Sequence, residues 1–214
     1  LLVDASPTDL THGEPGMSCV RAALSAGRHV VMANKGPLVL AFDELTEMAN
    51  EAGIQLLYSG TVAGGLPTVN LGVRDLAGSG VVRVEGIFNG TTNYILTRME
   101  QERISYEEAL KGAQEAGIAE ADPTLDVDGW DAANKLVIIA NSVLRRPTTL
   151  DDLTVKGIRD VTLDDLERAR SQGRVIKLLA IAEKTDDDYR LSVEPTWLEQ
   201  DHPMARTGMW DMGV

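Results

Sequence analysis

The sequence predicts an α/β protein in which part of a doubly wound parallel sheet is joined to a second α/β domain. In residues 1–60, short apolar runs alternate with amphipathic segments of about 13 to 18 residues, which is typical of βαβ units with parallel strands. From Gly60 onward the pattern changes to glycine-rich turns, several helices and two long strand-like runs. We therefore expect domains at residues 1–60 and 61–214.

The first domain is expected to contain three strands and two helices. Apolar runs typical of buried strands lie at residues 1–4, 29–33 and 54–58. A helix is expected over residues 15–27, because Pro15 suits a first helical turn and Gly27 suits a helix end, and a second helix is expected over residues 36–53. A nucleotide-binding half normally opens on a strand, a glycine-rich turn and a helix, and no G-x-G-x-x-G motif opens this chain.

The second domain is expected to begin with a glycine-rich turn at residues 60–67, followed by a helix of about 12 residues. The alternating run at residues 81–88 predicts a half-buried strand. Four further helices are expected, at 93–102, 106–116, 131–144 and 163–172. Ser105 and Glu108 form a capping-box pattern. Strands at 174–183 and 189–198 should form an antiparallel hairpin, and 117–130 and 145–161 should be loops.

Composition excludes several classes of protein. Thirty-three acidic residues against twenty basic ones give a formal charge of -13, which repels nucleic-acid backbones and anionic membrane surfaces. The apolar runs are far shorter than the roughly 20 residues of a membrane-spanning helix, and the first residues resemble no export signal. Cys19 is the only cysteine, which excludes an intrachain disulfide. We expect a cytoplasmic protein that binds neither nucleic acid nor membrane; a salt-adapted surface is another explanation of the acidity.

The most informative stretch is residues 117–135, where five carboxylates and one lysine fall within nineteen residues. Asp131 is expected to cap or begin a helix, and Lys135 follows one turn later on the same face. Glu120 and Asp126 belong to a loop that is able to fold over that face. Because Lys135 precedes an apolar run, its amine is expected to be partly desolvated and usable as a proton donor near neutral pH. The alternative is a surface ion pair on a capped helix.

Two other turns are candidate ligand sites. In residues 86–96 a strand ends at an Asn-Gly turn and a helix begins through threonines, so that backbone N–H groups would bind a carboxylate. The alternative there is a plain strand-to-helix connection with a threonine as the helix cap. In residues 31–38 a strand leads into a polar turn and a helix, at the sheet edge where doubly wound folds hold ligands. Lys35 is positioned there to reach toward a cofactor or substrate.

Together, residues 31–38, 86–96 and 120–136 resemble the homoserine dehydrogenase family. The segment Gly86-Ile87-Phe88-Asn89-Gly90-Thr91-Thr92-Asn93-Tyr94-Ile95-Leu96 is close to the signature of that family, and the resemblance runs through nearly the whole chain. It implies a Rossmann-like nucleotide domain joined to an α/β substrate-binding domain that forms a homodimer. It also implies NAD(P)-dependent interconversion of L-homoserine and L-aspartate 4-semialdehyde, in threonine, methionine and isoleucine biosynthesis.

The resemblance also implies roles for single residues. Lys135 would be the catalytic acid/base, giving a proton to the aldehyde oxygen while the nicotinamide delivers hydride. Glu120 would hold the substrate's α-ammonium, Asp131 would orient the lysine, and Asp126 would approach the oxygen end of the substrate. Further substrate contacts would come from Gly90, Thr91 and Lys35. Contacts to NAD or NADP would come from Lys35, Asn34, Ser6 and Thr8. Sodium would be bound by the backbone carbonyls of Val62, Gly64 and Leu66.

Three features depart from the family pattern. Ser59 stands where some members carry a glutamate ligand for the cation, and both the first glycine-rich turn and the C-terminal segment that returns to the nucleotide domain are absent. This stretch of chain is therefore expected to bind NAD(P) poorly by itself. Two other functions stay open: a catalytically silent module that dimerises and holds an amino acid, and another lysine-dependent oxidoreductase of amino acids, similar to saccharopine reductase.

Overall fold

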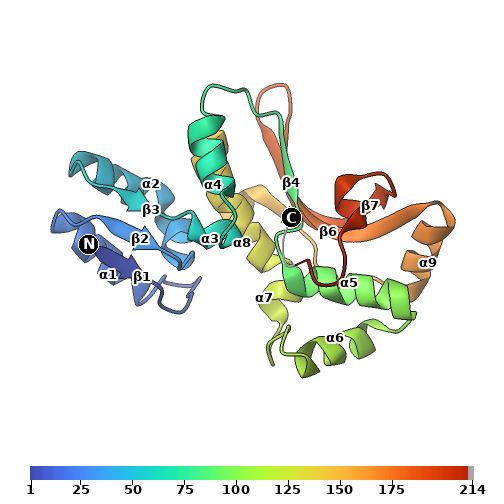
Figure 1. The fold of residues 1–214 in the computed structure, drawn as a ribbon. Coiled ribbons are helices and arrows are strands. Elements are labelled where there is room, and N and C mark those ends of the chain that lie inside the picture. Colours follow the sequence, from blue (N-terminus) through green and yellow to red (C-terminus); the bar gives the residue numbers. More distant parts are fainter. Residues whose placement is uncertain (212–214) are drawn as a thin grey trace. The chain divides into compact units, whose positions relative to one another are not determined.

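The computed structural model describes residues 1–211, which form two compact units (Figure 1). The first unit consists of residues 1–81 and 134–152, and the second consists of residues 82–133 and those from 153 onward. This division differs from the single boundary expected near residue 60. Its physical reason is close packing between two distant segments of the first unit, because a Cβ atom on Gly72 would lie 2.5 Å from a methyl carbon of Val143.

The sheet of the first unit is parallel, in the order β1-β2-β3. Its strands are β1 (Leu2–Asp4), β2 (Val30–Met32) and β3 (Leu56–Leu57), and α1 (Gly16–Ser25) and α2 (Gly36–Glu51) connect them. The buried side chains of α1 include Met17, Val20 and Leu24, which recur at helical spacing on one face. The expected βαβ units are therefore confirmed, and the fold class with them.

The rest of the first unit is helical. The turn expected at residues 60–67 contains a short helix, α3 (Gly60–Ala63), and the helix expected after it is divided into α4 (Thr68–Asn70) and the π-helical η1 (Leu71–Asp75). The chain passes between the two units within α8 (Trp130–Ile139), which continues into the π-helical η2 (Ala140–Leu144). A short 3₁₀-helix, η3 (Leu150–Asp152), follows.

The second unit is built on a sheet of order β4-β6-β7-β5. Its members are β4 (Arg83–Gly86), β5 (Leu153–Val155), β6 (Arg174–Lys184) and β7 (Tyr189–Glu199). The antiparallel hairpin of β6 and β7 is confirmed, with Ala180 opposite Val193. β4 pairs antiparallel with β6, whereas β5 pairs parallel with β7. β5 lies in the stretch 145–161, which was expected to be a loop. That expectation was wrong because a strand of three residues is too short to show an alternating pattern.

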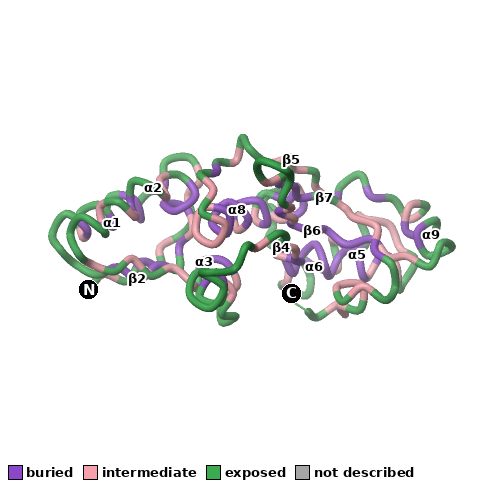
Figure 2. The backbone as a smooth tube through the Cα atoms, turned by 90° about the horizontal axis from the view of Figure 1, so that it is seen from above, coloured by how far each residue is buried: buried purple, intermediate pink, exposed green. Residues whose placement is uncertain are grey.

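Five helical segments accompany this sheet: α5 (Gly90–Glu102), α6 (Tyr106–Glu115), α7 (Thr124–Val127), α9 (Leu163–Ser171) and the 3₁₀-helix η4 (Pro203–Arg206). The capping box of Ser105 and Glu108 is confirmed at the start of α6. Most of α5 is buried, including its polar first turn (Figure 2). Within residues 1–211, no helix combines the length and the apolar character needed to cross a membrane.

Candidate active site

The turn between β4 and α5 is organised by Asn89. Its backbone is extended, with φ -137° and ψ 118°, and its side-chain Oδ1 accepts a hydrogen bond of 2.9 Å from the backbone N–H of Thr92. This is the geometry of a helix N-cap. The alternative expectation of a threonine cap was therefore wrong: an asparagine caps better than a threonine, and here it precedes the first helical residue, Gly90.

The same side chain joins two carboxylates from the acidic stretch. Nδ2 of Asn89 donates to Oδ1 of Asp126 at 2.7 Å and to Oδ2 of Asp131 at 3.0 Å. Asp126 lies on α7 and Asp131 in the first turn of α8. Asn89 itself is only 5% exposed. The structure therefore brings the predicted site residues Asp126 and Asp131 together around a residue that sequence reasoning had treated only as part of a turn.

The first turn of α5 is also tied to the loop after α6. Gly90 and Thr91 are buried, and Oγ1 of Thr91 donates to the carbonyl of Ile118 at 3.2 Å. Glu120 follows two residues later and is exposed, and its backbone carbonyl accepts a hydrogen bond of 3.2 Å from Nε2 of Gln114. The predicted substrate residues Gly90 and Thr91 thus lie where the acidic loop leaves α6.

Residues 157–159 also contact α7 and the residue that follows it. The N–H of Ile158 donates to the carbonyl of Val127 at 2.7 Å, and the guanidinium of Arg159 pairs with the carboxylate of Asp128. A Cβ atom on Gly157 would lie 2.2 Å from the carbonyl oxygen of Val127, so that only glycine allows this approach. These contacts hold the segment that carries Asp126.

Lys135 lies on α8, four residues after Asp131, and is partly buried. The helical spacing places both side chains on the same side of α8. The apolar run that follows Lys135 is buried, as expected. The preceding residue, Asn134, is fully buried, and neither polar atom of its side chain has a hydrogen-bond partner among the described residues. Buried side-chain amides without a hydrogen-bond partner are uncommon in folded proteins.

Two of the predicted cofactor residues meet in the first unit, where β1 and β2 end. Oγ of Ser6 donates to Oδ1 of Asp4 at 2.6 Å, and Nδ2 of Asn34 donates to Oγ of Ser6 at 3.2 Å. Oδ1 of Asn34 accepts the N–H of Gly36 at 2.9 Å, at the start of α2. Asp4 is buried and was missed from the sequence, although its place at the end of a strand was a usable signal.

The other two predicted cofactor residues lie close to this cluster in the chain. Lys35 is the partly buried residue just before α2, and Thr8 is exposed in the loop after Ser6. A Cβ atom on Gly16 would lie 2.6 Å from Oδ2 of Asp4, which explains the glycine that begins α1.

The predicted cation loop takes a different local form from a simple turn. Val62 is buried within the short helix α3, Gly64 follows with a φ of 57°, and Leu66 is exposed. Oγ1 of Thr61 donates to the carbonyl of Tyr58 at 2.7 Å. The described residues contain no group of three or more His, Cys, Asp or Glu side chains that could hold a metal ion.

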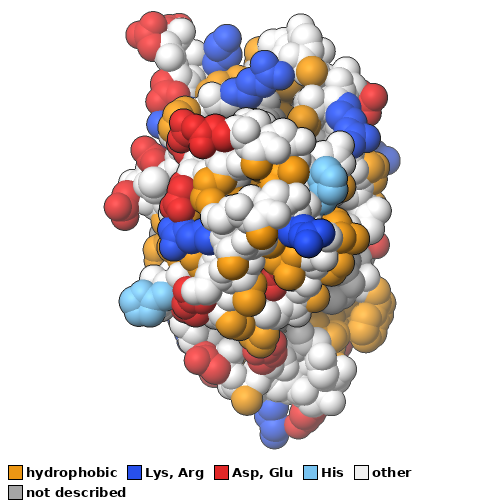
Figure 3. Space-filling model, turned by 90° about the vertical axis from the view of Figure 1, so that its left-hand side faces the viewer, with side chains coloured by type: hydrophobic (Ala, Val, Ile, Leu, Met, Phe, Trp, Pro, Cys, Tyr) orange, Lys and Arg blue, Asp and Glu red, His pale blue; other side chains and the backbone are white. Residues whose placement is uncertain are grey.

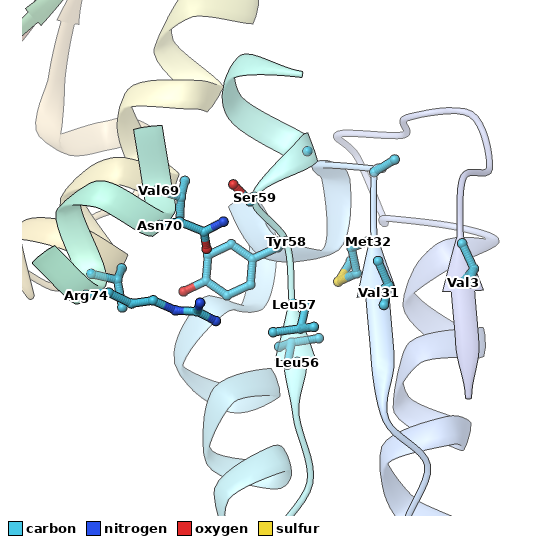
Figure 4. A pocket seen from close by; sticks show the side chains of 13 residues that line it. Val3, Val31, Met32, Leu56, Leu57, Tyr58, Ser59, Val69, Asn70 and Arg74 are labelled. Atoms are coloured by element: carbon cyan, nitrogen blue, oxygen red, sulfur yellow. The ribbon is translucent and has the colours of Figure 1, made fainter. Parts of the chain in front are cut away.

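The first unit also contains a cavity of about 410 Å³ against its sheet. Apolar side chains of the three strands form one side, and the ring of Tyr58 points toward Asn70 and Arg74 (Figure 4). Burial raises the pKa of Tyr58, while its hydrogen bond with Ser142 opposes that shift. Val3 remains 63% exposed. On the face shown in Figure 3, hydrophobic side chains lie in several groups among polar and charged ones.

A second buried network of hydrogen bonds joins α5 to β6. Nζ of Lys177, on β6, donates to Oδ1 of Asn93 at 2.8 Å, to Oγ1 of Thr97 at 2.7 Å and to the carbonyl of Thr207 at 3.1 Å. Burial lowers the pKa of Lys177 to about 8, although the carboxylates of Glu100 and Asp211 oppose the shift. Sequence reasoning missed this residue; the signal was a lysine inside an otherwise apolar strand.

Comparison with known proteins gives one consistent family. The family model described as homoserine dehydrogenase matches residues 67–214. Homoserine dehydrogenase of Methanocaldococcus jannaschii is 42% identical over 100% of this chain and 62% of its own length. The NAD(+)-dependent homoserine dehydrogenase of Pseudomonas canavaninivorans is 42% identical over 96% of this chain and 58% of its own length. The chain thus spans about 60% of these relatives.

Solved structures agree with the sequence comparison. A homoserine dehydrogenase from Thiobacillus denitrificans matches with a TM-score of 0.88 and 34% identity, over 91% of this chain and 45% of that one. Homoserine dehydrogenase from Thermoplasma acidophilum matches with a TM-score of 0.81 and 28% identity, over 97% of this chain and 62% of that one. The similarity therefore includes both units of the chain.

Proposed function

The chain belongs to the homoserine dehydrogenase family, and we propose that the protein interconverts L-homoserine and L-aspartate 4-semialdehyde with NAD or NADP. The observation that carries the proposal is the junction of Asp126 and Asp131 through Asn89 at the start of α5. Two carboxylates with a shared donor favour a cationic group, and the first turn of a helix favours an anionic one. An amino acid carries both charges.

In this reaction the residues of the chain carry out one proton transfer. When bound, the nicotinamide cofactor supplies hydride to the aldehyde carbon of aspartate semialdehyde. Lys135 gives a proton to the aldehyde oxygen, which becomes the hydroxyl of homoserine, and takes that proton back in the reverse direction. Asp131, one turn earlier on α8, orients the ammonium of Lys135. Glu120, on the loop that follows α6, holds the α-ammonium of the substrate.

The residues at the end of β1 and β2 fit a nicotinamide cofactor. Ser6 and Asn34 place a hydroxyl and an amide at the carboxyl edge of a parallel sheet, where doubly wound folds bind nucleotides. The buried Asp4 accepts the hydrogen bond of Ser6 and so fixes the direction of that hydroxyl. Lys35 and Thr8 would add contacts from the same loops. The Pseudomonas relative is named for NAD(+), which supports this cofactor class.

Three further family features belong to the same proposal: a cytoplasmic location, a homodimer, and sodium held by the carbonyls of Val62, Gly64 and Leu66. Sedimentation at increasing protein concentration tests the dimer, and titration of activity with NaCl against choline chloride tests the ion. Ser59, in place of a glutamate, makes a weak response to sodium the expected result.

The reaction is tested by following NAD(P)H oxidation with aspartate 4-semialdehyde, using protein made from the complete reading frame that contains these residues. The matched control substrate is succinic semialdehyde, which has the same chain without the α-amine. We expect turnover of the first and a kcat/KM at least about 100-fold lower for the second, because Glu120 would be left without its cation. A folded protein that turns over neither aldehyde would overturn the proposal and favour the silent amino-acid-binding module.

A further inference from the structure

We propose that Asn89 is a positioning residue that holds Asp126 and Asp131 together as one paired acidic site. This inference rests on the proposed function, and it adds a residue for which neither the family resemblance nor the turn pattern gave a role beyond the backbone. The inference starts from the hydrogen bonds of the Asn89 side chain. Its Nδ2 donates to two carboxylates on two different helices, at 2.7 and 3.0 Å.

The orientation of the Asn89 amide follows from its neighbours. Oδ1 faces a backbone N–H donor, that of Thr92, and Nδ2 faces two carboxylate oxygens. The reversed orientation would place Oδ1 against two negatively charged acceptors and Nδ2 against a donor. Both protons of the nitrogen are therefore committed to Asp126 and Asp131. Since the amide is planar, the two carboxylates are fixed relative to each other and to the start of α5.

Helix capping does not explain this arrangement. The cap uses Oδ1 alone, and serine or aspartate at the same position would cap α5 about as well. Nδ2 is the part of the side chain that capping leaves unused, and it is the part that contacts Asp126 and Asp131. Asn89 is 5% exposed, so water would replace its donors poorly if they were removed.

The paired site has a definite consequence for the substrate. Two carboxylates held close together repel each other unless donors or a cation lie between them. Asn89 supplies neutral donors between them, so the spacing of the two carboxylates is set before the substrate arrives. In the proposed function Asp126 approaches the oxygen end of the substrate and Asp131 orients the ammonium of Lys135, so the spacing of the pair acts on the reacting end of the amino-acid substrate. Loss of Asn89 should therefore affect the amino-acid substrate and leave the cofactor unaffected.

Three substitutions separate the two roles of Asn89. Asn89→Ser keeps the cap and removes the bridge, Asn89→Asp keeps the cap and adds a third carboxylate, and Asn89→Ala removes both. We expect kcat/KM for L-homoserine to fall about 10- to 100-fold in Asn89→Ser and further in Asn89→Asp, with the KM for the cofactor unchanged. If Asn89→Ser has wild-type kcat/KM, or restores what Asn89→Ala loses, Asn89 is only a cap.

A double-mutant cycle tests whether Asn89 acts through its partner. In an Asp126→Asn background the additional change Asn89→Ser should have much less effect on kcat/KM than it has alone, because the bridged carboxylate is already gone. Equal effects in the two backgrounds would contradict positioning through Asp126.

Thermal unfolding tests the bridge without any activity. At pH 7 we expect Asn89→Asp to melt below Asn89→Ser, with a difference that shrinks toward pH 4 as carboxylates gain protons. A cap-only role predicts the reverse order, because aspartate caps at least as well as serine and favours the helix N-terminus. A wild-type protein without turnover would overturn the proposed function and the positioning role together, while the order of melting would still establish or exclude the bridge.

Discussion

Replacing Lys177 by methionine isolates the energetic effect of a buried charge in the second unit. Lys177 is 2% exposed and donates three hydrogen bonds, to Asn93, Thr97 and the carbonyl of Thr207. Methionine has a similar length and fills irregular core space without a charge. The substitution therefore removes the charge and its donors while it disturbs the packing little.

The size and sign of the effect follow from the pKa. Burial lowers the pKa of Lys177 from 10.5 to about 8, so the folded protein holds this proton less tightly than the unfolded chain does. The resulting cost to folding is about 3 kcal/mol. It is fully present below about pH 8 and is relieved as the pH rises toward 10.5, the value in the unfolded chain.

At pH 7 two effects of Lys177→Met oppose each other. The variant escapes the cost of burying the charge, but it leaves the carbonyl of Thr207 without its donor, at about 1–3 kcal/mol. The hydroxyl of Thr97 lies 3.4 Å from Oδ1 of Asn93 and can turn to serve that acceptor. The two proteins should therefore be of similar stability at pH 7, and the wild type should gain about 3 kcal/mol over the variant by pH 10.5.

Urea unfolding measured from pH 7 to pH 10.5 tests this. All three tryptophans, at positions 130, 197 and 210, lie in the second unit, so their fluorescence reports on the unit that contains Lys177. Lys184, exposed at the end of β6, provides the control substitution to methionine. A difference between wild type and Lys177→Met that stays constant across this range would show that the amine is not desolvated, and would refute the reasoning.

Two further predictions concern local structure. Ser105→Ala removes one half of the capping box of α6 and should lower the free energy of unfolding by about 1 kcal/mol in the same urea assay; no change would mean that the box is not formed. Gly157→Ala forces a Cβ atom against the carbonyl of Val127 and should lower the melting temperature by several degrees, with loss of homoserine turnover because α7 is displaced. Its control, Gly80→Ala, meets no atom within 4 Å and should leave both unchanged.

Features encoded by neighbouring residues could be predicted from the sequence. The alternation of short apolar runs with helices gave the parallel sheet, and the Ser105–Glu108 spacing gave the start of α6. The polar turn at residues 185–188 gave the hairpin of β6 and β7. For the parallel sheet and the hairpin, the strands that pair follow one another directly along the chain, so the order of the elements indicates which of them pair.

Features that depend on distant partners could not be predicted. The role of Asn89 depends on carboxylates 37 and 42 residues away in the chain, and the network of Lys177 depends on residues 80 and 84 positions away. β5 is a strand only because β7 lies beside it. Asp126 and Asp131 could nevertheless be proposed from the sequence, because carboxylates concentrated in one stretch are visible without knowing what they contact.

We propose that Lys135 is the acid of an aldehyde reduction, and one comparison tests this role most directly. The rate of NAD(P)H oxidation with saturating aspartate 4-semialdehyde is measured for the wild type and for Lys135→Ala, with the exposed Lys111→Ala as the control. Loss of the proton donor should lower kcat about 100-fold or more, while the control stays near the wild type. A Lys135→Ala protein with wild-type kcat would contradict the account.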